Sequence, residues 1–565
     1  MRKLFAMAII ASLLPALALA DSTSFRSMQS GWFSGYTPLF DHGILGQRQV
    51  IAILDTGLDW DSCYFAEANG ARPPMNTGSP SGGLSSSNVD TSRRKVIAYD
   101  FLYSCDQFPG AFGCDDPNDP TAFDNALHGT LAAGVAAGDS HAYLQADDEA
   151  DGIAPGAKLI VQDGGYIGGD NCSQRPGFGC PVNLTPILDQ AYKQGARIHS
   201  NSWGDRQSTP PSLPAPTANY SAAARDVDAF VWSHPDMLLV FDTGNQGNNT
   251  PPPAGSVPAP GCAKNGIQVG GTRYTGIHPW DDVVTPFSYI GPTRDGRIKP
   301  DLVAPSYVVS AGSDGNVTTG NCNTSPQSGT SWSAPSVAGA AALVRQYFTD
   351  GFYPTGVATP ANAFAPSAAL LKAMLIAAAR SVPNDWTYNV GLTPAKPAPT
   401  FEQGFGFPVL DDAIYFPGDQ ARVRVADVPL AQGLTQGDTA TLQLHVAAGT
   451  PLKVALVWTD PAGVPRSVSD STPELVNDLD LRVTDSTGTT LLGNDSLHPG
   501  QPDRLNNVEV VSMATPPAGL YTISVTATHL GIGPRQSYAL VITGDLTDAI
   551  PPIANATART RSARH

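Results

Sequence analysis

Short apolar runs alternate with longer stretches of helical periodicity between residues 50 and 407. Four runs bounded by Gly, Asp or Asn have the length of buried strands, and they lie at residues 50–54, 158–162, 197–201 and 237–241. Apolar residues at helical spacing predict helices at residues 185–194, 331–348 and 367–380. This alternation predicts an α/β fold, in which a mostly parallel sheet carries helices on both faces.

The pattern changes between residues 421 and 544, where apolar and polar residues alternate with a period of two. Runs of this kind lie at residues 441–446, 452–457, 479–483 and 521–526. Helical spacing is nearly absent there, so we expect an antiparallel β-sandwich. The expected domains are an α/β domain at residues 21–418 and a sandwich at residues 419–545, followed by a basic disordered tail at residues 546–565.

The first twenty residues have the parts of an export signal in the usual order. Arg2 and Lys3 precede an apolar stretch at residues 4–14, and Ala-Leu-Ala ending at Ala20 is a small-residue cleavage site. The stretch is too short to span a membrane comfortably, and Pro15 interrupts it. We therefore expect a signal peptide at residues 1–20 and a soluble, secreted protein, either extracellular or periplasmic.

The 565 residues include 50 acidic and 33 basic side chains, which gives a formal net charge of −17. This balance argues against nucleic acid and anionic membranes as partners. The hydrophobic fraction of 41% is enough to build buried cores, so a wholly disordered chain is excluded.

The seven Cys do not form the repeated C-x-x-C pairs typical of zinc sites. In the oxidising compartment that export implies, Cys residues pair as disulfides. Six Cys alone allow 15 connectivities, so spacing does not decide among them. The pairing that we expect leaves Cys63 over and consists of Cys105–Cys114, Cys172–Cys180 and Cys262–Cys322.

Three short motifs place candidate catalytic side chains at the ends of predicted strands or helices. Asp55 ends a strand in Ile-Leu-Asp-Thr-Gly, and strand carboxyl ends are where open α/β sheets form their sites. His128 begins the small-residue helix His-Gly-Thr-Leu-Ala-Ala-Gly. Ser331 lies in Ser-Gly-Thr-Ser-Trp-Ser-Ala-Pro, at the start of an Ala-rich helix whose positive end and N–H groups suit an oxyanion.

These residue types together suit nucleophilic catalysis. A serine nucleophile needs a base that takes its proton, and the base needs an acid that fixes its tautomer. Asp-Thr-Gly alone is more typical of a turn, and His-Gly-Thr alone is equally consistent with a plain helix start, but the octapeptide around Ser331 is much more specific. In this order on an α/β pattern, the motifs predict a catalytic triad of Asp55, His128 and Ser331.

With these motifs the chain resembles the subtilisin-like serine proteases, the subtilase family, over nearly all of the expected mature sequence. The resemblance implies a serine endopeptidase that acts on polypeptides through an acyl-enzyme, without a catalytic cofactor and as a monomer. It implies that the side-chain amide of Asn245 donates to the oxyanion. It also implies that substrate backbone and the P1 side chain lie against Ser202, Trp203 and Gly204.

The C-terminal half resembles the oxidatively stable alkaline subtilases, which carry a calcium-binding jelly-roll domain. The segments that carry this resemblance are residues 475–481, 506–509 and 519–523. Asp478 and Asp480 lie on one face of a predicted strand, and Asn507 and Glu509 are likewise spaced two apart. Oxygen ligands from two strands suit a structural Ca²⁺, so the resemblance implies calcium at these four residues. From the residues alone, a solvated sandwich face is the alternative.

Four positions depart from the family pattern. Leu131 replaces the second His of His-Gly-Thr-His, Asp242-Thr243 replaces Ala-Ala before Gly-Asn, and Trp332 replaces the Met that usually follows the nucleophile. A carboxylate at position 242 would favour Arg or Lys at P1 if it turned into the specificity pocket, but not if it bonded elsewhere. The residues between Ala20 and the first strand are too few for the usual propeptide.

Two other classes of protein share some of these features. Asp55 and Asp242 both begin Asp-Thr-Gly, as in a pepsin-like aspartic protease, where two carboxylates share a proton. However, Leu58 and Asn245 stand where that class has Ser or Thr, and its domains are all β. An inactive protease fold that binds through its sandwich is the third hypothesis, but no triad residue is missing. The sandwich itself either binds substrate or stabilises the first domain, and we favour stabilisation.

Overall fold

The computed structural model describes residues 24–31, 36–78, 83–102, 116–121, 123–124, 127–140, 149–165, 183–204, 218–246, 252–274, 283–387, 391–467 and 469–550. The predicted signal peptide and residues 551–565 of the predicted tail lie outside these ranges. So do the two predicted disulfides Cys105–Cys114 and Cys172–Cys180. Within the ranges, no helix has both the length and the apolar character that crossing a membrane requires.

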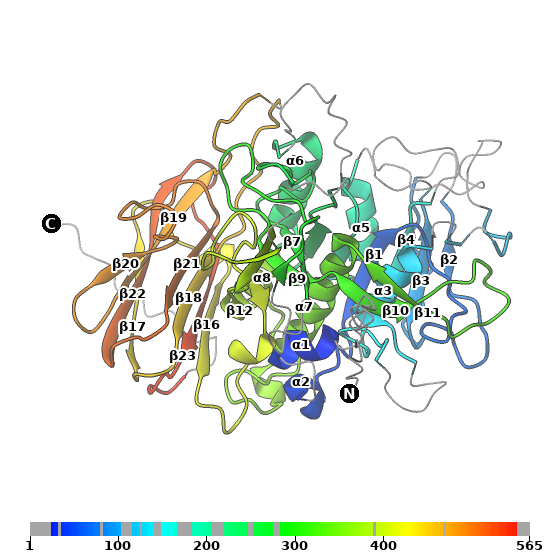
Figure 1. Ribbon diagram of the computed structural model, residues 1–565, viewed down its shortest axis with the longest axis horizontal. Helices are drawn as coiled ribbons and strands as arrows, with labels where there is room; N and C mark the ends of the chain where they lie inside the picture. Colours follow the sequence, from blue (N-terminus) through cyan, green and yellow to red (C-terminus); the bar gives the residue numbers. More distant parts are fainter. Residues whose placement is uncertain are drawn as a thin grey trace, which may run out of the picture.

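An eleven-stranded sheet forms the centre of the α/β part (Figure 1). Its order is β14-β13-β8-β7-β6-β5-β1-β4-β3-β2, with β9 paired to β7. All pairs are parallel except β7 with β8 and β13 with β14. The strands are β1 (Val50–Asp55), β2 (Met75–Asn76), β3 (Val96–Phe101), β4 (Lys158–Asp163), β5 (Ile198–Asn201), β6 (Leu238–Asp242), β7 (Ile267–Arg273), β8 (Val283–Val284), β9 (Leu302–Pro305), β13 (Asn384–Thr387) and β14 (Gly391–Pro394).

The mostly parallel order confirms the predicted α/β sheet. The four runs predicted as buried strands are β1, β4, β5 and β6, and their ends differ from the prediction by at most one residue. They read as continuous apolar runs because both faces of a parallel sheet are covered. Gln162 of β4 faces one side and donates a hydrogen bond to the Ile187 carbonyl oxygen of α5. Its neighbour Asp163 faces the other side and lies against Gly57.

The helices are rich in small residues where they pack most closely. Almost every residue of α7 is buried, and α7 packs against α3. A Cβ on Gly339 of α7 would lie 2.8 Å from the Ala136 carbonyl oxygen of α3, so glycine permits this approach. The α-helices are α1 (Ser24–Ser30), α2 (Pro38–Asp41), α3 (Gly129–Ala137), α5 (Thr185–Lys193), α6 (Ala222–Ser233), α7 (Ser333–Thr349) and α8 (Ala368–Ala377). The 3-10 turns are η1 (Thr330–Trp332), η2 (Pro360–Asn362), η3 (Leu410–Asp412) and η4 (Leu430–Gln432).

Two predicted helix ends are wrong. The helix expected from Ser331 begins at Ser333, because Ser331 belongs to the 3-10 turn η1. The helix expected to reach Arg380 ends at Ala377. Residues beyond it form β12 (Ala379–Arg380), which pairs with β15 (Phe407–Pro408), so strand pairing ends the helical run. A further two-stranded sheet joins β10 (Tyr307–Ala311) to β11 (Thr324–Ser328).

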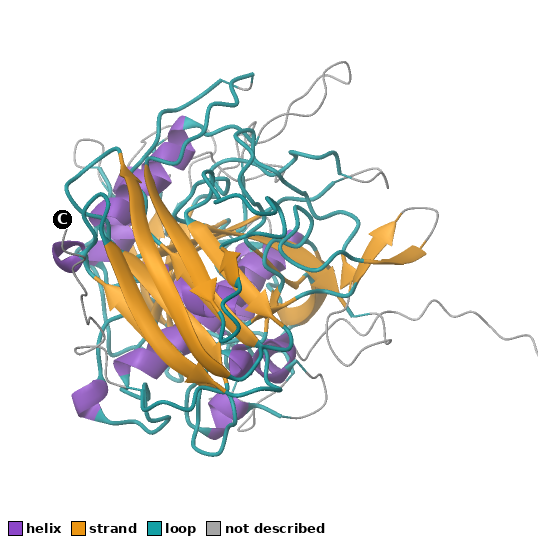
Figure 2. Cartoon of the chain, turned by 90° about the vertical axis from the view of Figure 1, so that its left-hand side faces the viewer, coloured by secondary structure: helices purple, strands orange, loops and turns teal. Residues whose placement is uncertain are grey.

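Residues 422–544 form two four-stranded antiparallel sheets that share a core. Figure 2 shows the outer sheet of this sandwich face on. One sheet has the order β16-β23-β18-β21 and the other β17-β22-β19-β20. The alternation shows on β22, where Tyr521, Ile523 and Val525 are buried between less buried neighbours. The predicted β-sandwich is confirmed, and its jelly-roll character stays a prediction. The strands are β16 (Arg422–Val428), β17 (Thr439–Val446), β18 (Leu452–Val457), β19 (Asn477–Thr484), β20 (Thr490–Leu492), β21 (Val508–Met513), β22 (Gly519–Leu530) and β23 (Tyr538–Gly544).

The sheet that contains β18 and β23 is buried on both faces. One face lies in the sandwich core, and the other packs on α8 (Figure 1). Side chains on this second face join the core of the α/β part: Val423, Val425, Ala455, Val457, Val508, Ala539 and Val541. The sandwich therefore shares a continuous apolar core with the α/β part.

The disulfide differs from the predicted pairing. Cys63 forms a disulfide with Cys322, 259 residues further along the chain. Cys262, which was expected to pair with Cys322, has a buried thiol that donates a hydrogen bond to the Asn219 carbonyl oxygen at 3.3 Å. The prediction failed because partner choice depends on the folded positions of the Cα atoms, which sequence spacing does not give.

Candidate active site

Asp55 and His128 make the central contact of the site. Asp55 is the last residue of β1, and His128 directly precedes α3. Their side chains are 4% and 2% exposed, and Asp55 Oδ1 lies 2.6 Å from His128 Nδ1. When Nδ1–H donates to this carboxylate, Nε2 is the nitrogen that remains to accept a proton. Nε2 is buried and makes no hydrogen bond to any described residue.

Glycines explain why these two side chains can meet. A Cβ on Gly129 would overlap the carbonyl oxygen of Gly57. Gly57 itself has a φ of +106°, and a Cβ there would lie 2.7 Å from Asp163 Oδ2. The start of α3 can therefore approach the end of β1 only because both positions lack side chains. The Asp-Thr-Gly and His-Gly-Thr motifs therefore provide the two sides of the contact between β1 and α3.

Asp124 joins the same two segments, and sequence reasoning missed it. Its Oδ1 accepts hydrogen bonds from Thr56 Oγ1 at 2.7 Å and from the His128 N–H at 3.2 Å. Its Oδ2 accepts the Thr130 N–H at 2.9 Å. Burial raises the pKa of Asp124 to about 6, although the bonds from Thr130 and Thr56 oppose this rise. The only sequence signal was an acidic residue shortly before a helix, where a carboxylate satisfies exposed N–H groups.

Ser331 lies in η1, and bonds from several elements fix that turn. Ser202, at the end of β5, donates a hydrogen bond from Oγ to the Ser331 carbonyl oxygen at 2.6 Å. Ser333 Oγ donates to the Ala304 carbonyl oxygen of β9 at 3.0 Å. η1 also packs against α3 next to His128. The fold therefore brings the predicted nucleophile and base to the same place.

Thr330, the residue directly before Ser331, holds Asn245 next to the nucleophile. Asn245 Oδ1 accepts the Thr330 N–H at 2.9 Å. Since a carbonyl oxygen and not an amide N–H must face that donor, the bond fixes the orientation of the Asn245 amide. Nδ2 then remains to donate elsewhere, as an oxyanion donor must.

A comparison with known families decides the classification. The chain matches the subtilase family over residues 46–406, a range that includes Asp55, His128, Asn245 and Ser331. The chain belongs to the subtilase family.

Curated relatives of this subtilase include two Dictyostelium discoideum proteins described as serine protease/ABC transporter B family proteins. The protein tagA is 28% identical over 91% of this chain and 31% of its own length. The protein tagB is 25% identical over 89% of this chain and 30% of its own length. The subtilase thus spans less than a third of the length of these relatives.

Two of the solved structures that are similar to this subtilase are proteases. The prenylagaramide maturation protease PagA is 19% identical, with a TM-score of 0.38, over 67% of this chain and 96% of its own. A serine protease of Aeromonas sobria is 15% identical, also with a TM-score of 0.38, over 93% of this chain and 95% of its own.

The predicted substrate-binding residues of the subtilase follow β5, at the same edge of the sheet as Asp55. Trp203 is 9% exposed and meets Phe241 edge to face, with ring centroids 6.2 Å apart. A Cβ on Gly204 would lie 2.9 Å from Pro258 Cγ. Ser202 directly precedes them and bonds to the Ser331 carbonyl oxygen, so this segment lies next to the nucleophile.

Trp332 fills the space behind the nucleophile of the subtilase. Its ring centroid lies 4.8 Å from that of His128, at an interplanar angle of 40°. The side chain is 2% exposed, and Nε1 has no hydrogen-bond partner among the described residues. The indole therefore packs directly on the imidazole.

The alternative dyad of an aspartic protease does not form. Asp55 contacts His128, whereas Asp242 Oδ2 accepts a hydrogen bond from Thr330 Oγ1 at 2.9 Å. Two carboxylates with separate partners cannot share the proton that a pepsin-like mechanism requires.

The four predicted calcium ligands are engaged with protein groups. Arg504 Nη1 lies 2.8 Å from Asp478 Oδ2 and also forms an ion pair with Asp480. Glu509 Oε2 accepts the Leu481 N–H at 2.6 Å. Asn507 Nδ2 instead donates to the Trp458 carbonyl oxygen at 2.7 Å and to Asn265 Oδ1 of the α/β part at 3.1 Å.

No three His, Cys, Asp or Glu side chains in the described part of the chain are arranged to hold a metal ion. Arg504 brings one positive charge to the two carboxylates of Asp478 and Asp480, and Asp478 Oδ1 and Glu509 Oε1 have no hydrogen-bond partner among the described residues. The predicted calcium site stays a prediction.

Proposed function

We propose that this subtilase is a secreted serine endopeptidase that hydrolyses polypeptides through an acyl-enzyme. The observation that supports this most directly is the 2.6 Å contact between Asp55 Oδ1 and His128 Nδ1. It fixes the tautomer in which Nε2 is the base, and η1 with Ser331 packs beside that imidazole. Family membership supports peptidase activity, and the export signal expected at residues 1–20 supports secretion.

In the proposed reaction Ser331 Oγ attacks the scissile carbonyl carbon while His128 Nε2 takes its proton. The imidazolium that forms is stabilised by Asp55 and returns the proton to the leaving amine. Water then repeats the sequence on the acyl-enzyme, with His128 again as base. Because Asp55 and His128 are almost fully buried, their interaction is screened little by solvent.

The tetrahedral oxyanion receives hydrogen bonds from Asn245 Nδ2 and the Ser331 N–H in this proposal. Thr330 orients the Asn245 amide through its own N–H. Loss of one such donor typically reduces turnover by about 10²–10³-fold. Substrate backbone lies along Ser202, Trp203 and Gly204.

The deciding experiment is cleavage of casein by Ser331→Ala and by a matched control. Ser331→Ala is expected to lose measurable turnover because no other nucleophile stands at this position. The control is Ser336→Ala, which removes a buried hydroxyl that bonds to the Trp332 carbonyl oxygen in the same segment. It should keep most of the activity. Undiminished cleavage by Ser331→Ala would overturn the assignment, and inhibition by pepstatin instead of an irreversible serine reagent would point to the aspartic class.

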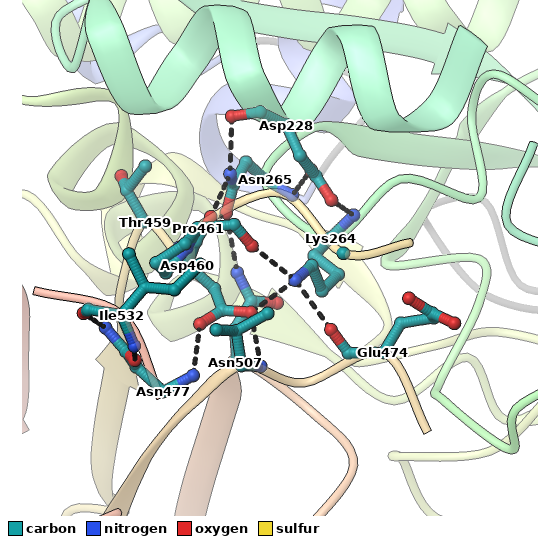
Figure 3. Close-up of polar contacts among 12 residues, drawn as sticks. Asp228, Lys264, Asn265, Thr459, Asp460, Pro461, Glu474, Asn477, Asn507 and Ile532 are labelled. Carbon is teal, nitrogen blue, oxygen red and sulfur yellow. Dashed lines mark hydrogen bonds and ion pairs between the residues drawn. The ribbon is translucent and has the colours of Figure 1, made fainter. Parts of the chain in front are cut away.

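We further propose that the sandwich stabilises the α/β part. Figure 3 shows Lys264 Nζ among oxygens of the sandwich. It forms an ion pair with Asp460 and donates to the carbonyl oxygens of Pro461 and Glu474, both at 2.7 Å. Lys264 and Asp460 are both fully buried. A buried ammonium that loses these partners is costly, so the α/β part depends on the sandwich for its own stability.

A second set of bonds joins the same two parts. Asn265 Oδ1 accepts the Asp460 N–H at 2.8 Å and Asn507 Nδ2 at 3.1 Å (Figure 3). Asn265 Nδ2 donates to the carbonyl oxygen of Asp228 at 3.2 Å and to that of Asp460 at 2.8 Å. Asn507, which the resemblance made a calcium ligand, is thus a domain-joining residue in this structure.

A further inference from the structure

Asp242 places a buried carboxylate next to the oxyanion donors, at a position where the family usually has a small residue. It is the last residue of β6 and is 4% exposed. Its Oδ2 accepts a hydrogen bond from Thr330 Oγ1 at 2.9 Å. Thr330 is the residue directly before the nucleophile, so the carboxylate is connected to the reacting segment through one side chain.

The Thr330 hydroxyl has two acceptors within reach but only one proton to donate. The second acceptor is Asn245 Oδ1, at 3.3 Å. Asp242 is the nearer of the two acceptors, so the hydroxyl proton points to Asp242. Asn245 Oδ1 then keeps the Thr330 N–H as its donor. Thr330 therefore binds Asp242 with its side chain and Asn245 with its backbone.

The acceptor end of this linkage is rigid. The Asp242 carbonyl oxygen accepts Gln268 Nε2 at 3.3 Å, and the next residue, Thr243, donates its N–H to the Val269 carbonyl oxygen at 3.0 Å. Both bonds come from β7, in the middle of the large sheet. Thr330 is fully buried, so solvent does not offer its hydroxyl another acceptor.

We propose that Asp242 is a positioning residue of the oxyanion site. It holds Thr330, and through Thr330 it holds the Asn245 amide and the Ser331 N–H at the distance that a developing oxyanion requires. This inference rests on the proposed serine protease function. It assigns the carboxylate to the oxyanion site and not to the recognition of a basic P1 side chain, because its bond points to Thr330.

The test compares Asp242→Ala, Thr330→Val and the double variant on one peptide substrate. Titration with an irreversible serine reagent gives the concentration of active enzyme. Each single variant is expected to lower kcat about tenfold and to change KM less than about twofold, because the loss concerns a transition-state interaction. The double variant should be no slower than about the slower single variant, since both changes break the same bond.

Conservative variants and a matched control separate positioning from general damage. Asp242→Asn keeps an acceptor oxygen at this bond, and Thr330→Ser keeps the hydroxyl donor. Both variants should therefore recover most of kcat. The control is Asp100→Ala on β3, which removes another buried carboxylate that accepts two side-chain amides, from Asn76 at 2.7 Å and Gln194 at 2.8 Å. It should lower stability without lowering kcat.

Two results would overturn the inference. One is a double variant in which the two losses multiply, because Asp242 would then act independently of Thr330. The other is an Asp242→Ala enzyme with normal kcat, a raised KM and a P1 preference shifted away from Arg and Lys. Failure of the proposed function looks different, because the wild-type enzyme would then not react with the serine reagent and Ser331→Ala would stay active.

Discussion

We expect Trp332 to set the sensitivity of the enzyme's activity to oxidation. Methionine at this position would become a polar sulfoxide beside Ser331, whereas an indole reacts more slowly with peroxide. Here the indole is buried against the His128 ring. We expect the wild-type enzyme to keep most of its activity in dilute peroxide and Trp332→Met to lose it quickly.

The measurement is residual peptidase activity over time in peroxide, with Trp332→Phe as the control that lacks a thioether. Cys63 does not complicate the result, because it forms the disulfide with Cys322. Equal and rapid inactivation of wild type and Trp332→Met would show that this position does not set the sensitivity.

Asp100 makes stability depend on pH. Burial raises its pKa to about 7, although the hydrogen bonds from Gln194 and Asn76 oppose this. Because the folded-state pKa is the higher one, the contribution to stability is complete below about pH 4 and is lost as pH rises through about 7. Each pKa unit corresponds to about 1.4 kcal/mol, so the loss is at most about 4 kcal/mol.

Asp100→Asn should therefore be more stable than wild type at pH 8 and gain less, or nothing, at pH 4. The amide keeps the acceptor oxygen, since Asn76 and Gln194 both donate to the same Oδ1. Urea unfolding at the two pH values measures the difference, in a Ser331→Ala background that cannot digest itself. An identical pH dependence in both proteins would contradict the assignment.

At the scale of single residues, sequence reasoning worked where local motifs dictate geometry. The contact between Asp55 and His128 could be expected from their motifs, because the glycines that follow both residues permit this close approach. Asp124 was not predictable, because it acts on backbone N–H groups of a helix from outside it. The bond between Asn507 and Asn265 could not be predicted, because the two residues are 242 positions apart in the sequence.

Among the elements, the sheet could be predicted better than the ends of its helices. The strands β1, β4, β5 and β6 are buried on both faces, so their composition alone identifies them. The turn η1 before α7 left no signal, because Thr, Ser and Trp also suit a helix start. The position of Ser331 outside the α-helix goes with the bond from Ser202 to its carbonyl oxygen and with the bond from Ser333 to Ala304 of β9.

Strands β19 and β21, which lie in different sheets of the sandwich, carry three of the four predicted calcium ligands and so provide the test of that prediction. The sequence predicts that a chelator lowers the melting temperature of the inactive Ser331→Ala protein by several degrees. Arg504 forms ion pairs with Asp478 and Asp480, so Arg504→Gln should make the carboxylates available and increase any dependence on Ca²⁺. Coincident melting curves with and without chelator, in both proteins, would retire calcium and leave Arg504 as the cation paired with these carboxylates.

At the scale of the whole molecule, the sandwich and the α/β part form one stability unit. Asp460→Ala would leave Lys264 buried without a counter-charge and would also remove the acceptor of the Asn477 N–H. Breaking a buried pair in this way costs about 3–5 kcal/mol. We expect a loss of this size in urea unfolding, seen equally by probes in both parts.

The matched control is Asp189→Ala, which breaks the exposed pair of Asp189 with Lys193 on α5. That change should cost less than about 1 kcal/mol. Equal small losses in both variants would mean that the ion pair between the two parts does not stabilise the folded protein. The sequence could not predict this ion pair, because Lys264 and Asp460 come together only when the chain is folded.

The Cys63–Cys322 disulfide has a consequence for the lifetime of an enzyme that can digest itself. The two residues are 259 positions apart, and His128 and Asn245 lie between them. A single autolytic cut anywhere in that interval leaves both fragments covalently attached, so the nicked molecule can keep its shape and its activity. Such molecules would run as full-length protein on a denaturing gel until a reductant is added. Autolysis in a stored preparation would therefore be detected only after the disulfide is reduced.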